Sequence, residues 1–155
     1  ENYLYVGAIV HDDVHYQNQM PVKVYIEDSI TVTLVPTKTQ RHDTRIDVGL
    51  TNYFEHEVYE EDYHDTHIYK NWSQVFDTYY NGPMRQGEGL SQAKAIRKGN
   101  TTYYEVRLKW NEILDKKTIE EDRQFNLNFT VRDYDGDRDK TWSSDWWFVL
   151  TDTKN

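Results

Sequence analysis

Asp133, Asp135 and Asp137 stand at alternate positions near the C-terminal end of the chain, and their type and spacing suit metal binding. They surround Gly136 and follow a segment in which apolar and polar residues alternate. Calcium takes about six to eight oxygen ligands, and a short aspartate-rich turn supplies several carboxylate oxygens at once. The turn therefore predicts a structural calcium site at these three aspartates. An ordinary Asp-Gly turn with solvated carboxylates is the alternative interpretation.

Aromatic residues offer a second kind of chemistry, because the C–H face of a sugar ring packs on a flat aromatic face. Polar neighbours must then hydrogen-bond to the sugar hydroxyls. Residues 69–88 mix aromatic rings with such groups, so we predict that Trp72 and Tyr79 bind sugar. Trp146 is added from the last strand, where Trp147 follows it and must point to the opposite face. Packing of these rings into an aromatic-rich core is the alternative interpretation.

Composition narrows the classes of function. The chain has 155 residues, enough for one domain with one core, and carries a formal charge of -9. That charge argues against nucleic acid and anionic membranes as partners, since both reward clustered lysine and arginine. The chain has no cysteine, which excludes disulfides and cysteine-based zinc sites. No run of about 18 apolar residues is present, so no membrane span is predicted.

Enzyme motifs are missing as well. The sequence contains no Ser-His-Asp signature, phosphate-binding loop, H-E-x-x-H helix or dinucleotide fingerprint, and we predict a non-catalytic protein. A glycoside hydrolase fragment is one alternative, because two of the 27 acidic residues could flank a cleft. A haem-binding domain that uses Met20 or Met84 together with histidine is another.

A two-residue period dominates the pattern and predicts short strands. The expected strands are residues 3–10, 22–26, 29–35, 45–50, 90–97, 102–110, 125–131 and 146–150. Residues 3–10 are expected to be buried, and Asn111 is expected to cap a helical turn. Residues 53–89 lack a clear period and predict a long loop region with short strands near Tyr69 and 75–79. The chain is therefore expected to form an all-β, antiparallel, jelly-roll-like sandwich.

Two further acidic clusters lie where strands are expected to end or begin. Asp12 and Asp13 follow the first strand, and Glu27 and Asp28 precede the third. For Asp28 we predict a structural role, in which its carboxylate caps backbone N–H groups.

Four stretches in this order resemble the family 9 carbohydrate-binding modules: residues 1–13, 27–36, 99–114 and 125–142. The resemblance implies a β-sandwich and a sugar clamp made of two tryptophans and polar groups. Tyr25 stands at the position of the first clamp tryptophan, and Asp47 and Gly49 stand where the family has arginine and asparagine. The predicted sugar-binding set is accordingly Tyr25, Asp47, Trp72, Tyr79 and Trp146.

The family's usual opening strand is absent here, so residues 1–155 are expected to form one domain that lacks its N-terminal strand. The predicted function is binding of a polysaccharide or oligosaccharide by an extracellular or cell-surface module of a longer protein. A structural or adhesion module without sugar binding is the alternative.

Overall fold

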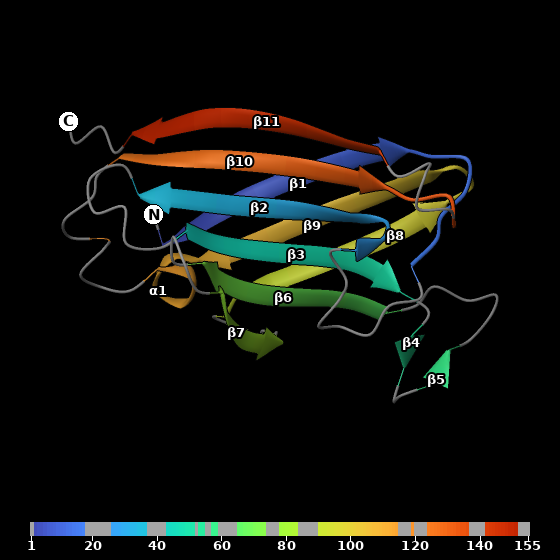
Figure 1. The fold of residues 1–155 in the computed structure, drawn as a ribbon, viewed down its shortest axis with the longest axis horizontal. Helices are drawn as coiled ribbons and strands as arrows, with labels where there is room; N and C mark the ends of the chain where they lie inside the picture. The colour runs from blue at the N-terminus through green and yellow to red at the C-terminus, as the bar shows by residue number, and fades with distance from the viewer. Residues whose placement is uncertain are drawn as a thin grey trace.

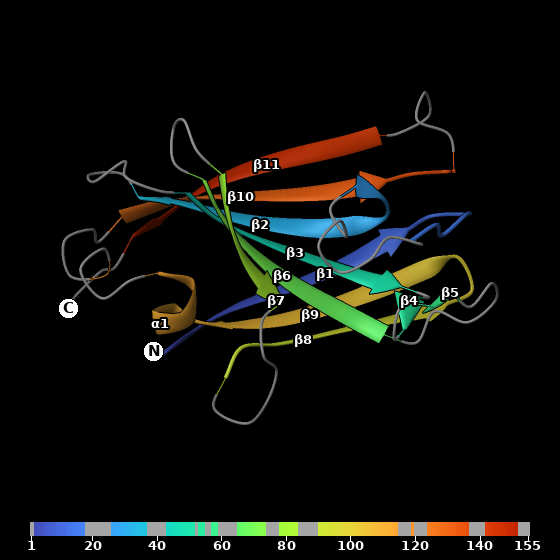
Figure 2. The ribbon, with the colours of Figure 1, turned by 60° about the horizontal axis from the view of Figure 1, so that its bottom comes forward.

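Two antiparallel sheets pack face to face in the computed structural model of this chain (Figures 1 and 2). The structure describes residues 2–17, 26–36, 43–51, 53–54, 57–58, 65–73, 78–83, 90–114, 119, 124–136 and 142–151. This architecture confirms the all-β antiparallel sandwich expected from the two-residue period.

The smaller sheet has the strand order β1-β9-β8. Its strands are β1 (Tyr3–His11), β8 (Gln92–Lys98) and β9 (Thr101–Lys109). A tight turn at Gly99 and Asn100 joins β8 to β9, as the sequence predicts, and Gly99 takes a positive φ of 57° that favours glycine. β1 pairs with β9 over its whole length, from Tyr3 opposite Lys109 to His11 opposite Thr101.

The larger sheet has the order β11-β10-β2-β3-β6-β7. Its strands are β2 (Ser29–Pro36), β3 (Asp43–Thr51), β6 (Asp65–Ser73), β7 (Thr78–Pro83), β10 (Gln124–Asp133) and β11 (Trp142–Thr151). A separate pair is formed by β4 (Tyr53–Phe54) and β5 (Glu57–Val58). Figure 2 shows this sheet as one layer and the β1-β9-β8 sheet as the other.

The core lies between the two sheets and follows the alternation in the sequence. Ile30, Val32 and Leu34 of β2 are fully buried, and in β9 the buried apolar side chains are Tyr104, Val106 and Leu108. Each fully buried aliphatic side chain contributes about 1.5–3 kcal/mol to folding. The intervening positions of β9 face outward, as expected: Tyr103 and Glu105 are exposed, while Arg107 is half-buried. Phe125, Leu127 and Phe129 of β10 pack against this core.

One short helix is described, α1 (Trp110–Ile113), and it follows β9 directly. Lys109 is its N-cap residue and makes no side-chain capping hydrogen bond, so the prediction that Asn111 caps this turn is wrong. The cap lies two residues earlier than predicted, at the last residue of β9. In the described part of the chain, no helix is long and apolar enough to cross a bilayer.

Two other expectations need correction. Residues 53–89 are not mainly a loop region, because β6 is a nine-residue strand paired with β3 on one side and β7 on the other. β6 is rich in polar residues, so it shows no clear alternation of apolar and polar positions, while backbone pairing on both sides holds it extended.

β1 is not buried on both faces: its exposure alternates, and Tyr5 and Ile9 are 65% and 63% exposed. The strand expected at residues 22–26 lies almost wholly outside the described residues.

Candidate functional site

Acidic residues from three segments, with one histidine, meet at one end of the sandwich. β1 ends at His11 and is followed by Asp12 and Asp13; β2 begins just after Asp28; β10 ends at Asp133. Antiparallel pairing brings the end of β10 beside the start of β2, and β1, in the facing sheet, runs toward the same end (right-hand end of Figure 1). We call Asp12, Asp13, His15, Asp28, Asp133 and Asp135 the carboxylate cluster.

Asp28 is the buried centre of this cluster. Its Oδ2 accepts a hydrogen bond from the Tyr16 backbone N–H at 2.5 Å, and its Oδ1 accepts one from Tyr134 N–H at 2.6 Å. Its own N–H donates to the Tyr16 carbonyl at 3.2 Å. The rings of Tyr16 and Tyr134 meet edge to face, with centroids 5.5 Å apart. The predicted capping role of Asp28 is confirmed, and the two amides come from opposite ends of the chain.

His15 links this centre to the larger sheet. Its Nε2 lies 2.8 Å from the carbonyl oxygen of Leu50, the penultimate residue of β3. A carbonyl only accepts hydrogen bonds, so the contact places a proton on Nε2. Nδ1 then faces Oδ2 of Asp28 at 3.3 Å. When the imidazole is protonated it bridges Leu50 and Asp28 as a donor on both sides.

Asp12, Asp13 and Asp135 form the outer part of the cluster, and their carboxylate oxygens lie within 4.8 Å of one another. Asp12 Oδ1 accepts a hydrogen bond from Val14 N–H at 2.8 Å. Arg97, from β8, is the nearby cation: its Nη1 lies 3.6 Å from Asp12 Oδ2, and its Nη2 donates to the Asp12 carbonyl at 2.8 Å. Burial raises the pKa of Asp12, although Val14 N–H and Arg97 oppose the shift.

Asp133 is a carboxylate whose negative charge is poorly compensated by its surroundings. Burial raises its pKa to about 6, and the neighbouring carboxylates add to the shift in the order Asp12, Asp28, Asp135 and Asp13. Its Oδ1 is buried and has no hydrogen-bond partner among the described residues. A buried polar atom without a partner costs about 1–3 kcal/mol, so a donor or a cation beside this oxygen would stabilise the folded state.

The donor set fits a hard divalent cation. Five carboxylates converge on this end, and among the described residues the guanidinium of Arg97 lies beside them. Like charges this close oppose ionisation, whereas a bound cation removes the repulsion. Calcium prefers oxygen ligands, which Asp12, Asp13 and Asp135 would supply, and Asp133 Oδ1 would gain a positive partner. The ion would supply charge neutralisation that ties the end of β1 to the loop after β10.

The predicted metal set is thus only part of this arrangement. Asp135 groups with Asp12 and Asp13 from the other end of the chain, and Asp133 lies close enough for their charges to raise its pKa. Asp137 lies outside the described residues. Calcium binding by the three predicted aspartates stays a prediction, but the candidate site is now shared between the segments after β1 and β10.

The predicted sugar-binding aspartate, Asp47, is fully buried in β3. Its Oδ1 accepts hydrogen bonds from the Thr31 hydroxyl at 2.7 Å and from Arg45 Nε at 2.8 Å. These contacts join β2 to β3 and leave no exposed surface on Asp47 for a ligand. A sugar-binding role for Asp47 therefore gains no support from its surroundings.

The predicted aromatic residues are only partly brought together. Trp72 of β6 and Tyr79 of β7 are register partners. Trp146 lies on β11 at the other edge of the sheet, opposite Phe129. With about 4.8 Å between strands, the four steps from β11 to β6 separate Trp146 from Trp72 by roughly 19 Å. Tyr25, Met20 and Met84 lie outside the described residues.

Sequence reasoning missed several residues of the cluster. The sequence identifies Asp12 and Asp13 as an acidic strand end, but no local sequence pattern indicates that they lie close to Asp135. His15 and Arg97 gave no signal either, because a single histidine or arginine in a polar segment is ordinary. Both reach the cluster through contacts with residues distant in the sequence, His15 with Asp28 and Arg97 with Asp12.

Comparison with known proteins leaves the resemblance to family 9 carbohydrate-binding modules as a prediction: no family model, no curated protein and no solved structure matches this chain.

Proposed function

We propose that this chain is a non-catalytic carbohydrate-binding module whose β-sandwich is stabilised by calcium. In this proposal the ion sits in the carboxylate cluster and stiffens the segments after β1 and β10. The module would belong to a longer extracellular or cell-surface protein, and polysaccharide or oligosaccharide would be its ligand.

The observation that carries the calcium part is the convergence of Asp12, Asp13 and Asp135, beside Asp133 Oδ1, which has no partner among the described residues. A folded chain with this much uncompensated charge at one point loses stability unless a cation binds there. The chain has no cysteine, so a bound ion is a suitable alternative to a disulfide for stiffening its loops.

The carbohydrate part of the proposal is supported by solvent-exposed aromatic side chains. Tyr5 is 65% exposed and Tyr103 is 41% exposed, and both lie on the outer face of the smaller sheet. An exposed ring on a rigid strand binds a sugar face with little loss of conformational entropy, because it is already held in place.

Two measurements test the proposal. Calcium added to chelator-treated protein should raise the melting temperature, whereas magnesium at the same concentration should raise it less. A glycan array probed with the calcium-loaded protein should give hits that disappear when the protein is unfolded. No thermal shift with calcium, together with an array without hits, would refute both parts.

The separation of Trp146 from Trp72 and the burial of Asp47 favour a second candidate, a structural or adhesion module without sugar binding. The two candidates agree on calcium and differ on glycans. A thermal shift with calcium but no binding to any glycan would therefore select the second candidate.

A further inference from the structure

The outer face of the β1-β9-β8 sheet has an ordered arrangement of side chains that follows from its register. Tyr5, Arg107 and Gln92 form one row across the three strands, and Gly7, Glu105 and Lys94 form the next. A third row is apolar and consists of Ile9, Tyr103 and Ile96. Successive rows lie about 7 Å apart, since side chains on one face recur every second residue.

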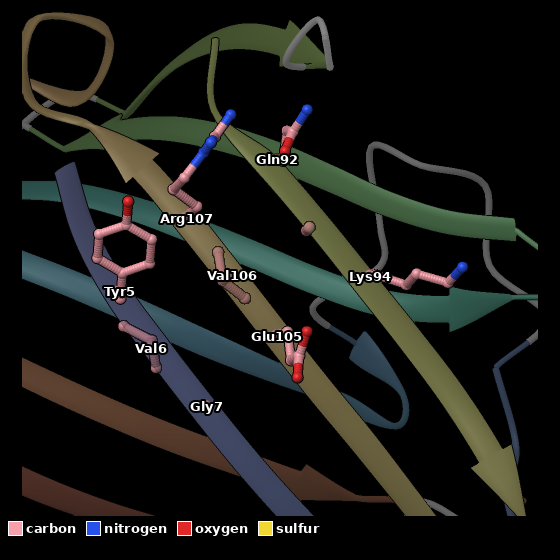
Figure 3. Close-up of a pocket in the computed structure, with 9 residues that line it drawn as sticks. Tyr5, Val6, Gly7, Gln92, Lys94, Glu105, Val106 and Arg107 are labelled. Atoms are coloured by element: carbon pink, nitrogen blue, oxygen red, sulfur yellow. The ribbon is translucent and has the colours of Figure 1, made fainter. Parts of the chain in front are cut away.

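The first two rows line an open groove of about 790 Å³. Gly7 lacks a side chain, so no side chain projects into the groove at this position of β1. Figure 3 shows Tyr5 on β1, Arg107 and Glu105 on β9, and Gln92 and Lys94 on β8, around this groove. The exposed ring of Tyr5 therefore stands beside donors and an acceptor on one rigid sheet.

This face is basic although the chain as a whole is acidic. Its outward positions carry four basic side chains, Lys94, Lys98, Arg107 and Lys109, and one acidic side chain, Glu105. The whole chain has a formal charge of -9. A local excess of positive charge on an acidic protein favours a ligand that carries negative groups.

Arg107 is held in a fixed position before any ligand arrives. Its guanidinium carbon lies 4.7 Å from the centroid of the Tyr3 ring, and its Nη2 donates to the Leu90 carbonyl at 3.2 Å. Its Nε is buried and has no partner among the described residues. A guanidinium fixed in this way binds a planar carboxylate with less loss of entropy than a mobile side chain.

We propose that this groove binds an acidic polysaccharide whose sugar rings carry carboxylates. A sugar ring packs on Tyr5 over Gly7, its carboxylate pairs with Arg107 or Lys94, and its hydroxyls hydrogen-bond to Gln92 and Glu105. The inference rests on the proposed carbohydrate binding and names its surface and its ligand class. Nucleic acid fits less well, because phosphate chains need more basic contacts than the four on this face.

A galacturonate pentamer and its methyl ester, titrated calorimetrically into the calcium-loaded protein, test the proposal. The ester keeps the sugar rings and removes the charge. We expect the acid to bind with a Kd that rises with added salt, and the ester to bind roughly tenfold or more weakly. A polyglutamate peptide of matched charge should not bind, because it has no ring to place on Tyr5.

Gly7→Val places a branched side chain in the groove. A Cβ at Gly7 would meet only the Tyr104 carbonyl oxygen, at 3.9 Å, which is ordinary contact. Valine is favoured in strands, so the melting temperature should not fall. We expect the Kd for the pentamer to rise roughly tenfold or more. Lys94→Gln should raise it about threefold, and Lys98→Gln, about 14 Å further along the same face, should have a smaller effect.

Equal binding of the acid and the ester, or equal binding of polyglutamate, would overturn the ligand class. Unchanged pentamer binding by Gly7→Val would overturn the surface. If the protein binds neutral glycans and Gly7→Val leaves that binding intact, this inference fails while carbohydrate binding stands. If the native protein binds no saccharide of either kind, both proposals fail.

Discussion

The backbone N–H of Tyr134 donates a 2.6 Å hydrogen bond to Asp28, which lies 106 residues earlier in the chain. Asp28 also accepts a hydrogen bond from Tyr16 N–H, so this one buried carboxylate connects the segment before β2 to the segment after β10. Hydrogen bonds to a charged group contribute about 1.5–3 kcal/mol each. We therefore predict that Asp28→Ala lowers the free energy of unfolding by about 3 kcal/mol, measured by urea denaturation.

Asp28→Asn is the matched control, because it keeps one oxygen acceptor and removes the charge. Its loss should be smaller than that of Asp28→Ala. Equal stability of the alanine variant and the native protein would show that the Asp28 contacts contribute nothing to folding.

Calcium should stabilise the protein through the outer part of the carboxylate cluster. At a free calcium concentration 100 times the Kd, binding adds about 2.7 kcal/mol to the free energy of unfolding. We predict that Asp135→Asn weakens calcium binding roughly tenfold, because it removes one charged ligand. Differential scanning fluorimetry across a calcium titration measures the Kd.

Glu105→Gln makes the same change of charge on the outer face of the smaller sheet, away from the cluster, and should leave calcium binding unaltered. An identical calcium response in Asp135→Asn and Glu105→Gln would remove Asp135 from the candidate site.

The fall in stability with rising pH should disappear when calcium is added. Burial and the neighbouring carboxylates raise the pKa of Asp133 from 3.8 to about 6, so between these pH values the folded state binds more protons than the unfolded state. Without calcium, this contribution to stability is complete below about pH 4 and is lost as pH rises through 6.

With saturating calcium the folded state holds Asp133 ionised, as the unfolded state does at these pH values, so the loss of stability between pH 4.5 and 6.5 should disappear. Unfolding curves at pH 4.5, 5.5 and 6.5, with calcium or with a chelator, measure both slopes. Equal slopes of unfolding free energy against pH, with calcium and with a chelator, would mean that the ion does not interact with Asp133.

Asp47 should matter for folding and not for ligand binding. It is fully buried, and its Oδ1 accepts hydrogen bonds from Thr31 and Arg45. Removing one partner of a buried ion pair leaves an uncompensated charge, although part of the Arg45 side chain reaches solvent. We predict that Asp47→Ala costs about 2–3 kcal/mol of stability.

Glycan binding by the folded fraction of Asp47→Ala should equal that of the native protein. Thr31→Val removes only one of the two hydrogen bonds and should cost about 1 kcal/mol. A loss of glycan affinity in Asp47→Ala at a temperature where it is fully folded would restore the predicted sugar-binding role.

Replacing Gly136 with alanine should destabilise the fold, whereas the same replacement at Gly7 should not. Gly136 has a φ of 78°, and a Cβ there would lie 3.6 Å from the Tyr16 ring, an ordinary contact. The cost of Gly136→Ala therefore comes from the left-handed backbone and should be about 1–2 kcal/mol.

Gly7→Ala has no such cost, because its backbone is extended within β1, and it should be neutral or slightly stabilising. Thermal melts of the two variants measure the difference. Equal melting temperatures would mean that the turn at Gly136 adapts to a side chain.

The sequence by itself determined the strands with a clear two-residue period. β2 and β9 appear where the alternation predicts them, and their apolar positions line the core, because a strand that buries one face needs that alternation. β6 is predicted only as a short strand near Tyr69, since its full extent comes from pairing with β3 and β7 and not from its own pattern.

The candidate sites depended on the tertiary structure. The aspartate turn after β10 could be recognised locally as a cation-binding turn, but its partners Asp12 and Asp13 lie at the other end of the chain. The alternation of β1 places Tyr5 and Gly7 on one face, but only the register with β9 and β8 brings Arg107 and Lys94 beside them. Local patterns encode which face a residue occupies, whereas distances between segments follow from strand order and register, which the pattern of a single strand does not specify.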